Sequence, residues 1–389
     1  MKFCTLMLTF LVALGGCRAT APKETPVGPV PPGSFVQNWS SQTGYKTVKA
    51  LHHVGDMIFV YGENNQVTAY DTNGGAKFKI KVAQAGDILG EPMVSADRVV
   101  IPTSSTLEVY TRSNGVLRRT MNLKTPIRSP GVLIDNVVYI GIDAEHGGEI
   151  AAIDLDRPYN VIKWSRLVGV VRHRPALHEG TLYFTNEAGR VFALTTEPKV
   201  AWPITPQMPG GQFQTDGDVN APVSADDAGV FVSATDTKLY AIDPVGGRIR
   251  WTYYSGIPLQ TSPQITADTV YQFVDGQGLT ALDKKPGGPN IRQPRWTNRD
   301  ARLVLADDAQ YAYVLHAGGI AALDKKTGQE RFATKRSDFV KVTENLSAKD
   351  NTIYVLTRDN TLRAIKPVTR AGVVGQLVMA PATEEVAQR

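Results

Sequence analysis

Cysteine is almost absent from this 389-residue sequence, which contains only Cys4 and Cys17. Because both precede residue 20, the rest of the chain can form no disulfide and offers no thiol for catalysis. Long apolar runs are missing as well. The run from Phe3 to Leu14 has 12 residues, whereas a helix that spans a bilayer needs about 20. This run follows a short basic start, so it predicts an export signal and not an anchor helix.

A large excess of charge is also lacking. The chain has 42 Lys and Arg against 37 Asp and Glu, a net charge of +5. Removal of residues 1–16 would take away Lys2 and leave 41 − 37 = +4. Basic and acidic residues are interspersed, which is not the pattern of a nucleic-acid surface. We therefore expect no nucleic-acid partner.

Histidine is scarce, and its spacing does not suggest a metal site. His52 and His53 are adjacent, and successive side chains of a strand point to opposite faces. His173 and His178 are expected at opposite ends of one strand. The stretch DTNGG at 71–75 lacks the spaced carboxylates and the distal Glu of a calcium loop. We expect no metal and no cofactor.

The N-terminal segment indicates a lipid anchor. Leu14-Gly15-Gly16-Cys17 resembles a bacterial lipobox, in which the Cys becomes the acylated first residue of the mature chain. We predict a signal peptide over 1–16, lipid attachment at Cys17 and a stiff Pro-rich tether over 17–34. An Asp directly after the acylated Cys retains such lipoproteins at the inner membrane, and this sequence has Arg18 there. We therefore expect an outer-membrane location that faces the periplasm. The alternative to a lipid anchor is an ordinary signal peptide, in which Cys17 occurs by chance.

A short pattern recurs along the rest of the chain. Residues 239–251 read LYAIDPVGGRIRW, an apolar run that ends in Asp, breaks at a Gly pair and restarts before a Trp. Asp, Pro and Gly favour a tight turn, so the stretch predicts a hairpin. Eight copies start at Val67, Leu107, Ile150, Val191, Leu239, Leu279, Ile320 and Leu362. A period near 40 indicates one supersecondary unit that is repeated.

Each period contains four short strand patterns and no amphipathic helix. Before the fifth copy, for example, stand VNAPVSA at 219–225 and GVFVSAT at 229–235. Four strands per period of this length are typical of a β-propeller blade. We therefore predict an all-β, eight-bladed propeller of four-stranded antiparallel blades over residues 35–372, followed by a tail over 373–389.

The eighth copy lacks a fourth strand, and the N-terminus offers one. Residues 39–44, WSSQTG, match WSRLVG at 164–169 and WTYYSG at 251–256. We expect FVQNW at 35–39 to complete the eighth blade, which would close the ring and remove two exposed sheet edges. The rival strand is VVGQLVM at 373–379.

Two residue types in the repeat have structural interpretations. The third position of the pattern is Ala in seven copies, Val109 being the exception, and a small residue suits a crowded contact. Aromatic residues near the end of six of the units suit packing between blades. These are Phe78, Trp164, Trp202, Trp251, Trp296 and Phe332.

The repeat resembles the pyrroloquinoline-quinone-type propeller family over residues 35–370. One branch of that family contains quinoprotein dehydrogenases, which hold the quinone between a Trp and a disulfide of adjacent cysteines. The other contains non-enzymatic lipoproteins of outer-membrane β-barrel assembly, the BamB family. No Cys pair exists here, so the resemblance implies the second branch and no enzyme. Quinone-dependent dehydrogenation remains the unfavoured alternative.

A candidate site lies where the chain enters the innermost strands. VVRHRPAL at 170–177 is the most basic of these segments, and Arg128, Arg172, His173 and Arg174 form a candidate polar cluster at the mouth of the channel. Such a mouth could hold an anion or an acidic peptide. Alternatively, these residues only solvate the end of an open ring. Other polar residues at the same strand entries are Glu91, Asn220, Thr261, Arg302 and Glu344.

The function expected from these features is protein binding. We predict a monomeric ring that works within a complex, with the β-barrel assembly machinery or unfolded outer-membrane proteins as partners. The alternative is a binding module for cell-wall or extracellular polymer, which exposed aromatics on one face would favour.

Overall fold

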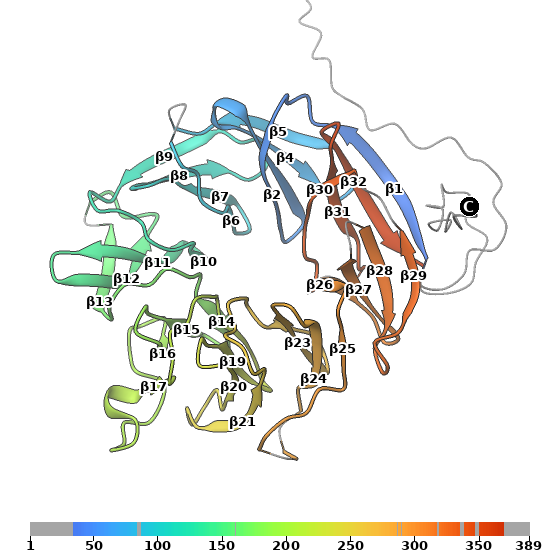
Figure 1. Ribbon diagram of the computed structural model, residues 1–389. Coiled ribbons are helices and arrows are strands. Elements are labelled where there is room, and N and C mark those ends of the chain that lie inside the picture. Colours follow the sequence, from blue (N-terminus) through green and yellow to red (C-terminus); the bar gives the residue numbers. More distant parts are fainter. Residues whose placement is uncertain are drawn as a thin grey trace, which may run out of the picture.

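The computed structural model describes residues 34–83, 87–159, 161–285, 287–288, 290–316, 319–334, 338–346 and 350–368. They form a ring of eight four-stranded antiparallel sheets around a central channel (Figure 1). The all-β eight-bladed propeller is therefore confirmed. The predicted signal peptide, Cys17, nearly all of the tether and the C-terminal tail lie outside the described residues.

Blades 1 to 7 follow one another along the chain, and each contributes four strands in sequence order. The first strands, which line the channel, are β2 (Val48–Val54), β6 (Met93–Val94), β10 (Val132–Ile134), β14 (Ala176–His178), β18 (Ser224–Asp226), β22 (Gln264–Ile265), β26 (Ala301–Asp307) and, in blade 8, β30 (Phe339–Val342). The second strands are β3 (Met57–Gly62), β7 (Arg98–Pro102), β11 (Val137–Ala144), β15 (Thr181–Thr185), β19 (Gly229–Ser233), β23 (Thr269–Val274), β27 (Tyr311–His316) and β31 (Ile353–Thr357).

The third strands carry the recurring sequence pattern. They are β4 (Gln66–Asp71), β8 (Thr106–Thr111), β12 (Gly147–Asp154), β16 (Arg190–Thr195), β20 (Lys238–Ile242), β24 (Gly278–Asp283), β28 (Gly319–Asp324) and β32 (Thr361–Pro367). The outer strands are β5 (Ala76–Lys81), β9 (Leu117–Asn122), β13 (Ile162–Leu167), β17 (Gln212–Gln214), β21 (Ile249–Tyr254), β25 (Trp296–Asn298), β29 (Glu330–Thr334) and, in blade 8, β1 (Phe35–Gln42).

Blade 8 closes the ring as the sequence predicts. Its strand order is β1-β32-β31-β30, so the N-terminal strand occupies the outer position. β1 pairs antiparallel with β32 from Phe35 opposite Pro367 to Gln42 opposite Thr361. In Figure 1 the blue first strand lies beside the red last strand. The rival segment 373–379 lies outside the described residues, but the place that it would take next to β32 is filled by β1.

The recurring Ala is small because large rings flank it on both sides. Ala281 lies opposite Tyr271 of β23 and Trp296 of β25, whose ring centroids are 5.9 Å apart. Ala69, Ala152, Ala241, Ala322 and Ala364 also lie between two rings. In blade 4, Ala193 lies opposite Tyr183, and the second ring, Trp202, precedes the outer strand. Blade 2 is the exception, since Val109 lies between Val100 and Arg119. A larger residue fits there because neither neighbour is a ring.

The Asp and the Gly of the repeat have separate tasks in the turn between the third and fourth strands. Asp243 Oδ1 accepts hydrogen bonds from the backbone N–H groups of Val245 and Gly246, at 2.9 and 3.2 Å. Gly247 has φ +68°, and a Cβ there would lie 2.9 Å from the Trp202 ring of the preceding blade. The indole Nε1 of Trp202 donates to the Pro244 carbonyl at 2.9 Å. The expected packing of aromatics between blades is thus confirmed here, with the ring seated on the next blade's turn.

Two blades depart from the regular unit. In blade 4, residues 203–211 are inserted between Trp202 and β17, and they include the short 3-10 helix η2 (Pro209–Gly211). This insertion accounts for the longest interval between sequence repeats. In blade 6, the segment before β25 covers the outer edge of β21, where Thr252 N donates to the Asn290 carbonyl and Arg292 N donates to the Thr252 carbonyl. Arg292 lies over the Trp251 ring, 5.3 Å from its centroid, whereas Trp39, Trp202 and Trp296 each face a Gly in the turn of the next blade.

Helix is almost absent from the described part of the chain. Besides η2, it contains only the 3-10 helix η1 (Glu63–Asn65). None of the described residues forms a helix long and apolar enough to cross a membrane. The position of functional groups is therefore set by strand ends and by the turns between them.

Candidate functional site

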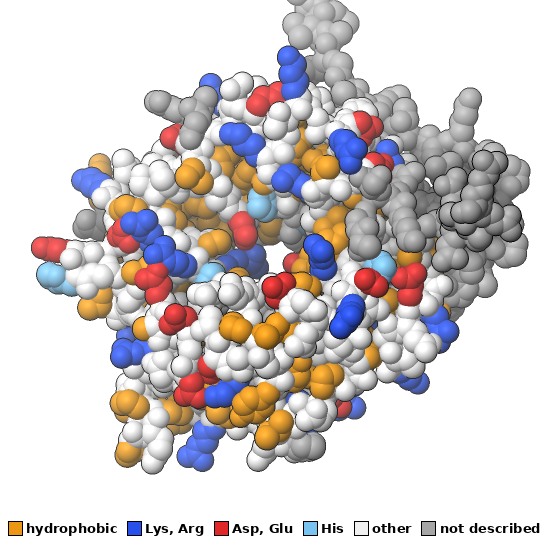
Figure 2. Space-filling model, viewed as in Figure 1, with side chains coloured by type: hydrophobic (Ala, Val, Ile, Leu, Met, Phe, Trp, Pro, Cys, Tyr) orange, Lys and Arg blue, Asp and Glu red, His pale blue; other side chains and the backbone are white. Residues whose placement is uncertain are grey.

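The central channel forms a cavity of about 1020 Å³ that is lined by the entries to the first strands. Figure 2 shows the hollow at the centre of the ring, with acidic, basic and histidine side chains around it. Of the polar residues that the sequence places at the strand entries, the following line the cavity: Glu91, Arg172, His173, Arg174, Thr261 and Glu344. Asn220 and Arg302 are not among its lining residues.

Three residues of the predicted cluster lie together on the channel wall of blade 4. Arg172, His173 and Arg174 immediately precede β14, and all of them line the cavity. Arg128 of blade 3 is not in the lining. It is held by Asp143 instead, with Nε 2.7 Å from Oδ1 and a second contact from Nη2 to Oδ2. The hydrogen bond from Arg128 is the main cause that lowers the pKa of the Asp143 carboxyl group, and the charge of Arg172 adds to it.

Each arginine of the cluster faces a carboxylate. Arg172 Nε contacts Glu187 Oε1 in the same blade. Arg174 Nη1 lies 3.7 Å from Glu91 Oε2, which belongs to the entry of β6 on the opposite side of blade 3. The mouth is thus a surface of alternating charge and not a purely basic one. A free anion would compete with these carboxylates, whereas a protein partner with charges of both signs could exchange ion pairs with them.

A second group of polar residues faces the cavity from blades 6 and 8. Gln264 donates from Nε2 to Glu344 Oε2 at 2.9 Å and to the Val304 carbonyl at 2.8 Å. Its Oε1 accepts from Val304 N at 2.8 Å. Burial raises the pKa of Glu344, and the nearby charge of Glu91 raises it further, although Gln264 and Arg174 act in the opposite direction. Gln264 is not among the residues predicted from the sequence, because its only signal is its polarity at a position that Ala176 occupies in blade 4.

Three imidazoles at this channel have a lowered pKa. For His173, burial is the main cause and the charge of Arg172 adds to it. Burial also lowers the pKa of His52 and of His53 on β2. The charge of Glu91 opposes the change at His52, and hydrogen bonds with the backbone of Glu344 and Gly55 oppose it at His53. Since the ordinary value is 6.5, we expect all three to be neutral at pH 7. The permanent charges of the mouth therefore come from its arginines and carboxylates.

The described residues contain one group of three side chains that could hold a metal ion. His178, Glu179 and Asp227 bring their ligand atoms within 4.8 Å of one another, at the end of β14 and on the turns that follow β14 and β18. His178 ends β14 and His173 precedes it, so the two histidines lie at opposite ends of that strand, as the sequence predicts. No such group lies at the channel mouth among the residues that the structure covers.

Comparison with known proteins gives both a family and a fold. A model of the family described as outer membrane protein assembly factor BamB matches residues 36–203 and 199–331. The crystal structure of BamB from Moraxella catarrhalis is similar with a TM-score of 0.64 and 17% identity, over 85% of this chain and 97% of that one. The computationally designed protein Ika8 gives a TM-score of 0.60 and 14% identity, over 86% of this chain and 100% of that one. At these identities the two structures support the fold alone. A search of curated protein sequences finds no match.

Proposed function

Because the chain belongs to the outer membrane protein assembly factor BamB family, we propose that it is a non-enzymatic scaffold that assists the assembly of outer-membrane β-barrel proteins. The observation that carries this proposal is the family match, which extends over residues 36–331. Protein binding is the mode of action that we infer from it. The partner is a component of the β-barrel assembly machinery or an unfolded outer-membrane protein.

We place the ring at the periplasmic face of the outer membrane. The basis is the sequence before the propeller: an export signal over 1–16, a lipobox that ends at Cys17, and Arg18 in place of a retention Asp. Acylation of Cys17 with several chains would give durable attachment, since one chain alone binds a membrane only marginally. The Pro-rich residues 19–33 would then hold the propeller at a distance from the bilayer.

The channel mouth is the surface that we assign to the partner. Arg172, His173 and Arg174 are grouped on one blade, and Arg172 has 55% of its side-chain surface exposed, so a partner can reach it. Ion pairs of this exposure contribute little to folding, so replacing them affects binding more than stability. The channel lining includes neither Trp nor Cys, the residues that hold a quinone in the dehydrogenases, and we propose no catalytic role for it.

Binding of a cell-wall polymer is the less favoured function. A polymer site of that kind uses aromatic side chains exposed on one face, and four of the five Trp are buried. Trp39, Trp202, Trp251 and Trp296 have at most 7% of their surface exposed. They pack between blades, as described above for Trp202, and so are not available for stacking on a sugar.

The test is crosslinking of the lipidated full-length protein in native envelopes, followed by mass spectrometry. We expect the large barrel protein of the assembly machinery to be recovered in near-stoichiometric amount. Arg172→Glu should reduce that recovery about tenfold, which corresponds to roughly 1.4 kcal/mol. Lys199→Glu is the matched control: it reverses an exposed charge in the same blade, between β16 and β17, and should leave recovery unchanged.

Two outcomes would count against the proposal. Absence of the barrel protein, with wall polymer or another envelope complex recovered in its place, would contradict the assembly role. Equal recovery with Arg172→Glu and Lys199→Glu would contradict the assignment of the channel mouth. Thermal melting of both variants shows whether either change has disturbed the fold.

A further inference from the structure

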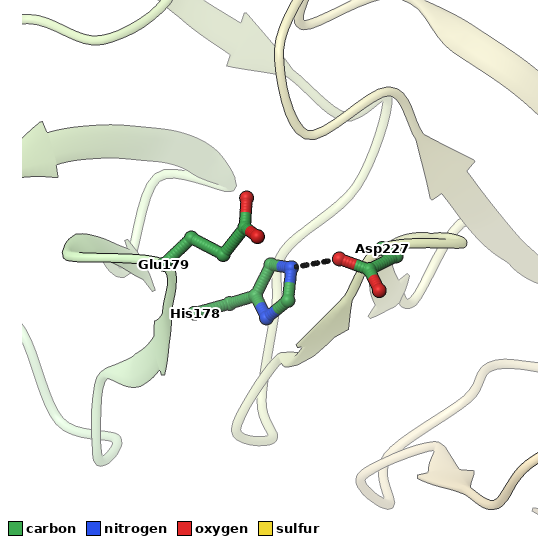
Figure 3. A group of neighbouring side chains, drawn as sticks. All are labelled: His178, Glu179 and Asp227. Atoms are coloured by element: carbon green, nitrogen blue, oxygen red, sulfur yellow. Dashed lines mark hydrogen bonds and ion pairs between the residues drawn. The ribbon is translucent and has the colours of Figure 1, made fainter.

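Three potential metal ligands meet at the junction of blades 4 and 5. His178 is the last residue of β14, Glu179 follows it in the turn to β15, and Asp227 belongs to the turn between β18 and β19. Figure 3 shows both side chains of blade 4 directed toward the Asp227 carboxylate. His178 Nε2 lies 2.9 Å from Asp227 Oδ1. The group therefore joins two neighbouring blades, at the end of β14 that lies away from Arg172.

The backbone of the turn explains why two successive side chains can serve one site. In a regular strand, His178 and Glu179 would point to opposite faces. Here Glu179 has φ +45° and Gly180 has φ +72°, so the chain reverses within these two residues. The change of direction brings the Glu179 carboxylate back to the side of the imidazole. Sequence spacing alone gives no sign of this arrangement.

The charges at this junction differ from those at the next two junctions. There an Asp at or just after the end of the first strand pairs with a Lys from the next blade, Asp226 with Lys284 at 2.5 Å and Asp268 with Lys325 at 2.9 Å. Within the described part of the chain, neither Glu179 nor Asp227 forms an ion pair with a Lys or Arg. Their two negative charges face one imidazole, and this imbalance favours a cation from solution.

We propose that His178, Glu179 and Asp227 form a site for a divalent transition-metal ion, for which Zn²⁺ is the reference. Zinc accepts imidazole nitrogen and carboxylate oxygen, and sites with three protein ligands keep a fourth position for water. Tetrahedral bonds of about 2.0–2.1 Å place ligand atoms about 3.3 Å apart. The side chains can reach that spacing by rotation, because Asp227 has 87% of its side-chain surface exposed. The bound ion would link blade 4 to blade 5. The proposal of this metal site does not depend on the proposed function.

The experiment is calorimetric titration of the purified full-length protein, in detergent and without a polyhistidine tag, with Zn²⁺. We expect one ion per chain and a rise in the melting temperature when Zn²⁺ is present. Loss of a residue that only supports a metal ligand weakens metal binding roughly 10- to 100-fold, and loss of a direct ligand should weaken it at least as much. We therefore expect His178→Ala and Asp227→Asn to weaken Zn²⁺ binding by at least this factor. Glu179→Gln should also weaken Zn²⁺ binding.

The matched control is His146→Ala, which removes an exposed histidine that also has a glutamate next to it in the sequence, Glu145. It should bind Zn²⁺ as the unchanged protein does. Melting in the absence of metal verifies that each variant is folded, and Asp227→Asn keeps the size of an exposed side chain. Binding that is unchanged in His178→Ala or in Glu179→Gln would overturn the three-ligand site. Mg²⁺ that binds as tightly as Zn²⁺ would overturn it too, because an imidazole ligand favours the transition metal.

Discussion

A single buried lysine holds blade 7 to blade 6. Lys325 follows the recurring Asp324 and has only 7% of its surface exposed. Its Nζ lies 2.7 Å from Asp307 Oδ2 in its own blade and 2.9 Å from Asp268 Oδ1 in the blade before. Burial works against the charge of Lys325, but the two carboxylates outweigh it and raise the pKa of the ammonium group. The ammonium therefore stays charged at neutral pH and compensates both acids.

Replacing this lysine should have an effect that depends on pH. Lys325→Met leaves the carboxylate of Asp307, which has 12% exposure, without its cation, and we expect a loss of about 3 kcal/mol at pH 7. Burial alone would raise the pKa of Asp268, but Lys325 and its other partners bring it below its ordinary value of 3.8. A carboxyl group whose pKa is lower in the folded state stabilises the fold at any pH above its ordinary value. This stabilisation is lost as the pH falls toward the lowered pKa. The difference between variant and unchanged protein should thus shrink toward pH 3.

Urea unfolding at pH 7 and at pH 3 measures this difference. The control is Lys326→Met, which removes the adjacent and exposed lysine and should change stability by less than about 0.5 kcal/mol at either pH. An equal loss for Lys325→Met at both pH values would show that packing, and not charge, accounts for the effect.

At the scale of an element, four described blade junctions share one contact, in which an aromatic ring rests on a glycine in the turn of the next blade. These glycines are Gly74, Gly115, Gly247 and Gly328. Gly328 in the turn after β28 has φ +68°, and a Cβ there would lie 2.6 Å from the Trp296 ring of blade 6. The Trp296 indole donates to the Lys325 carbonyl at 2.8 Å. The glycine is thus required for two reasons, its backbone conformation and the closeness of the ring.

These two reasons can be separated with a second glycine. Gly276 has φ +70°, and a Cβ added there would meet nothing within 4 Å. We expect Gly276→Ala to lose about 1–2 kcal/mol from the left-handed backbone alone. Gly328→Ala should lose about 1–3 kcal/mol more, because the ring must move. Urea unfolding of both variants gives the comparison, and equal losses would mean that Trp296 shifts at no cost.

The strands and turns of the repeating unit could be predicted from the sequence, because they depend on patterns of neighbouring residues. The Ala between two rings, the Asp of the turn and the Trp all recur in a short window, so their positions follow from the repeat. The segment before β25 breaks that rule. It pairs with Thr252 of the previous blade, and no local pattern indicates this contact between distant residues.

The candidate sites were less predictable for the same reason. The strand entries identify Arg172 and Arg174, but their partners Glu187 and Glu91 come from elsewhere in the chain. The approach of His178 to Asp227 depends on the packing of two blades and on the positive φ of Glu179. Residue types can be read from a sequence, whereas such convergence exists only once the ring is closed.

For the whole molecule, closure of the ring rests on one strand from the far end of the chain. β1 supplies Phe35 and Trp39 to the core, with 0% and 6% of their surface exposed. Trp39 Nε1 donates to the Thr72 carbonyl of blade 1 at 2.8 Å, while β1 itself pairs with β32 of blade 8. Trp39 thus connects the last blade to the first.

Loss of this connection should open the ring at one place. We expect Trp39→Ala to lose about 3–5 kcal/mol, as for other buried Trp residues, and to speed amide hydrogen exchange in β32 more than in β16. Trp202→Ala is the matched control: it removes an equally buried indole that also donates to the next blade, but at the junction of blades 4 and 5. Its faster exchange should stay in those blades. If the amides of β32 exchange at the same rate in Trp39→Ala as in the unchanged protein, closure through β1 is contradicted. The amides of β32 that face β1 would then be protected even without the Trp39 ring that anchors β1.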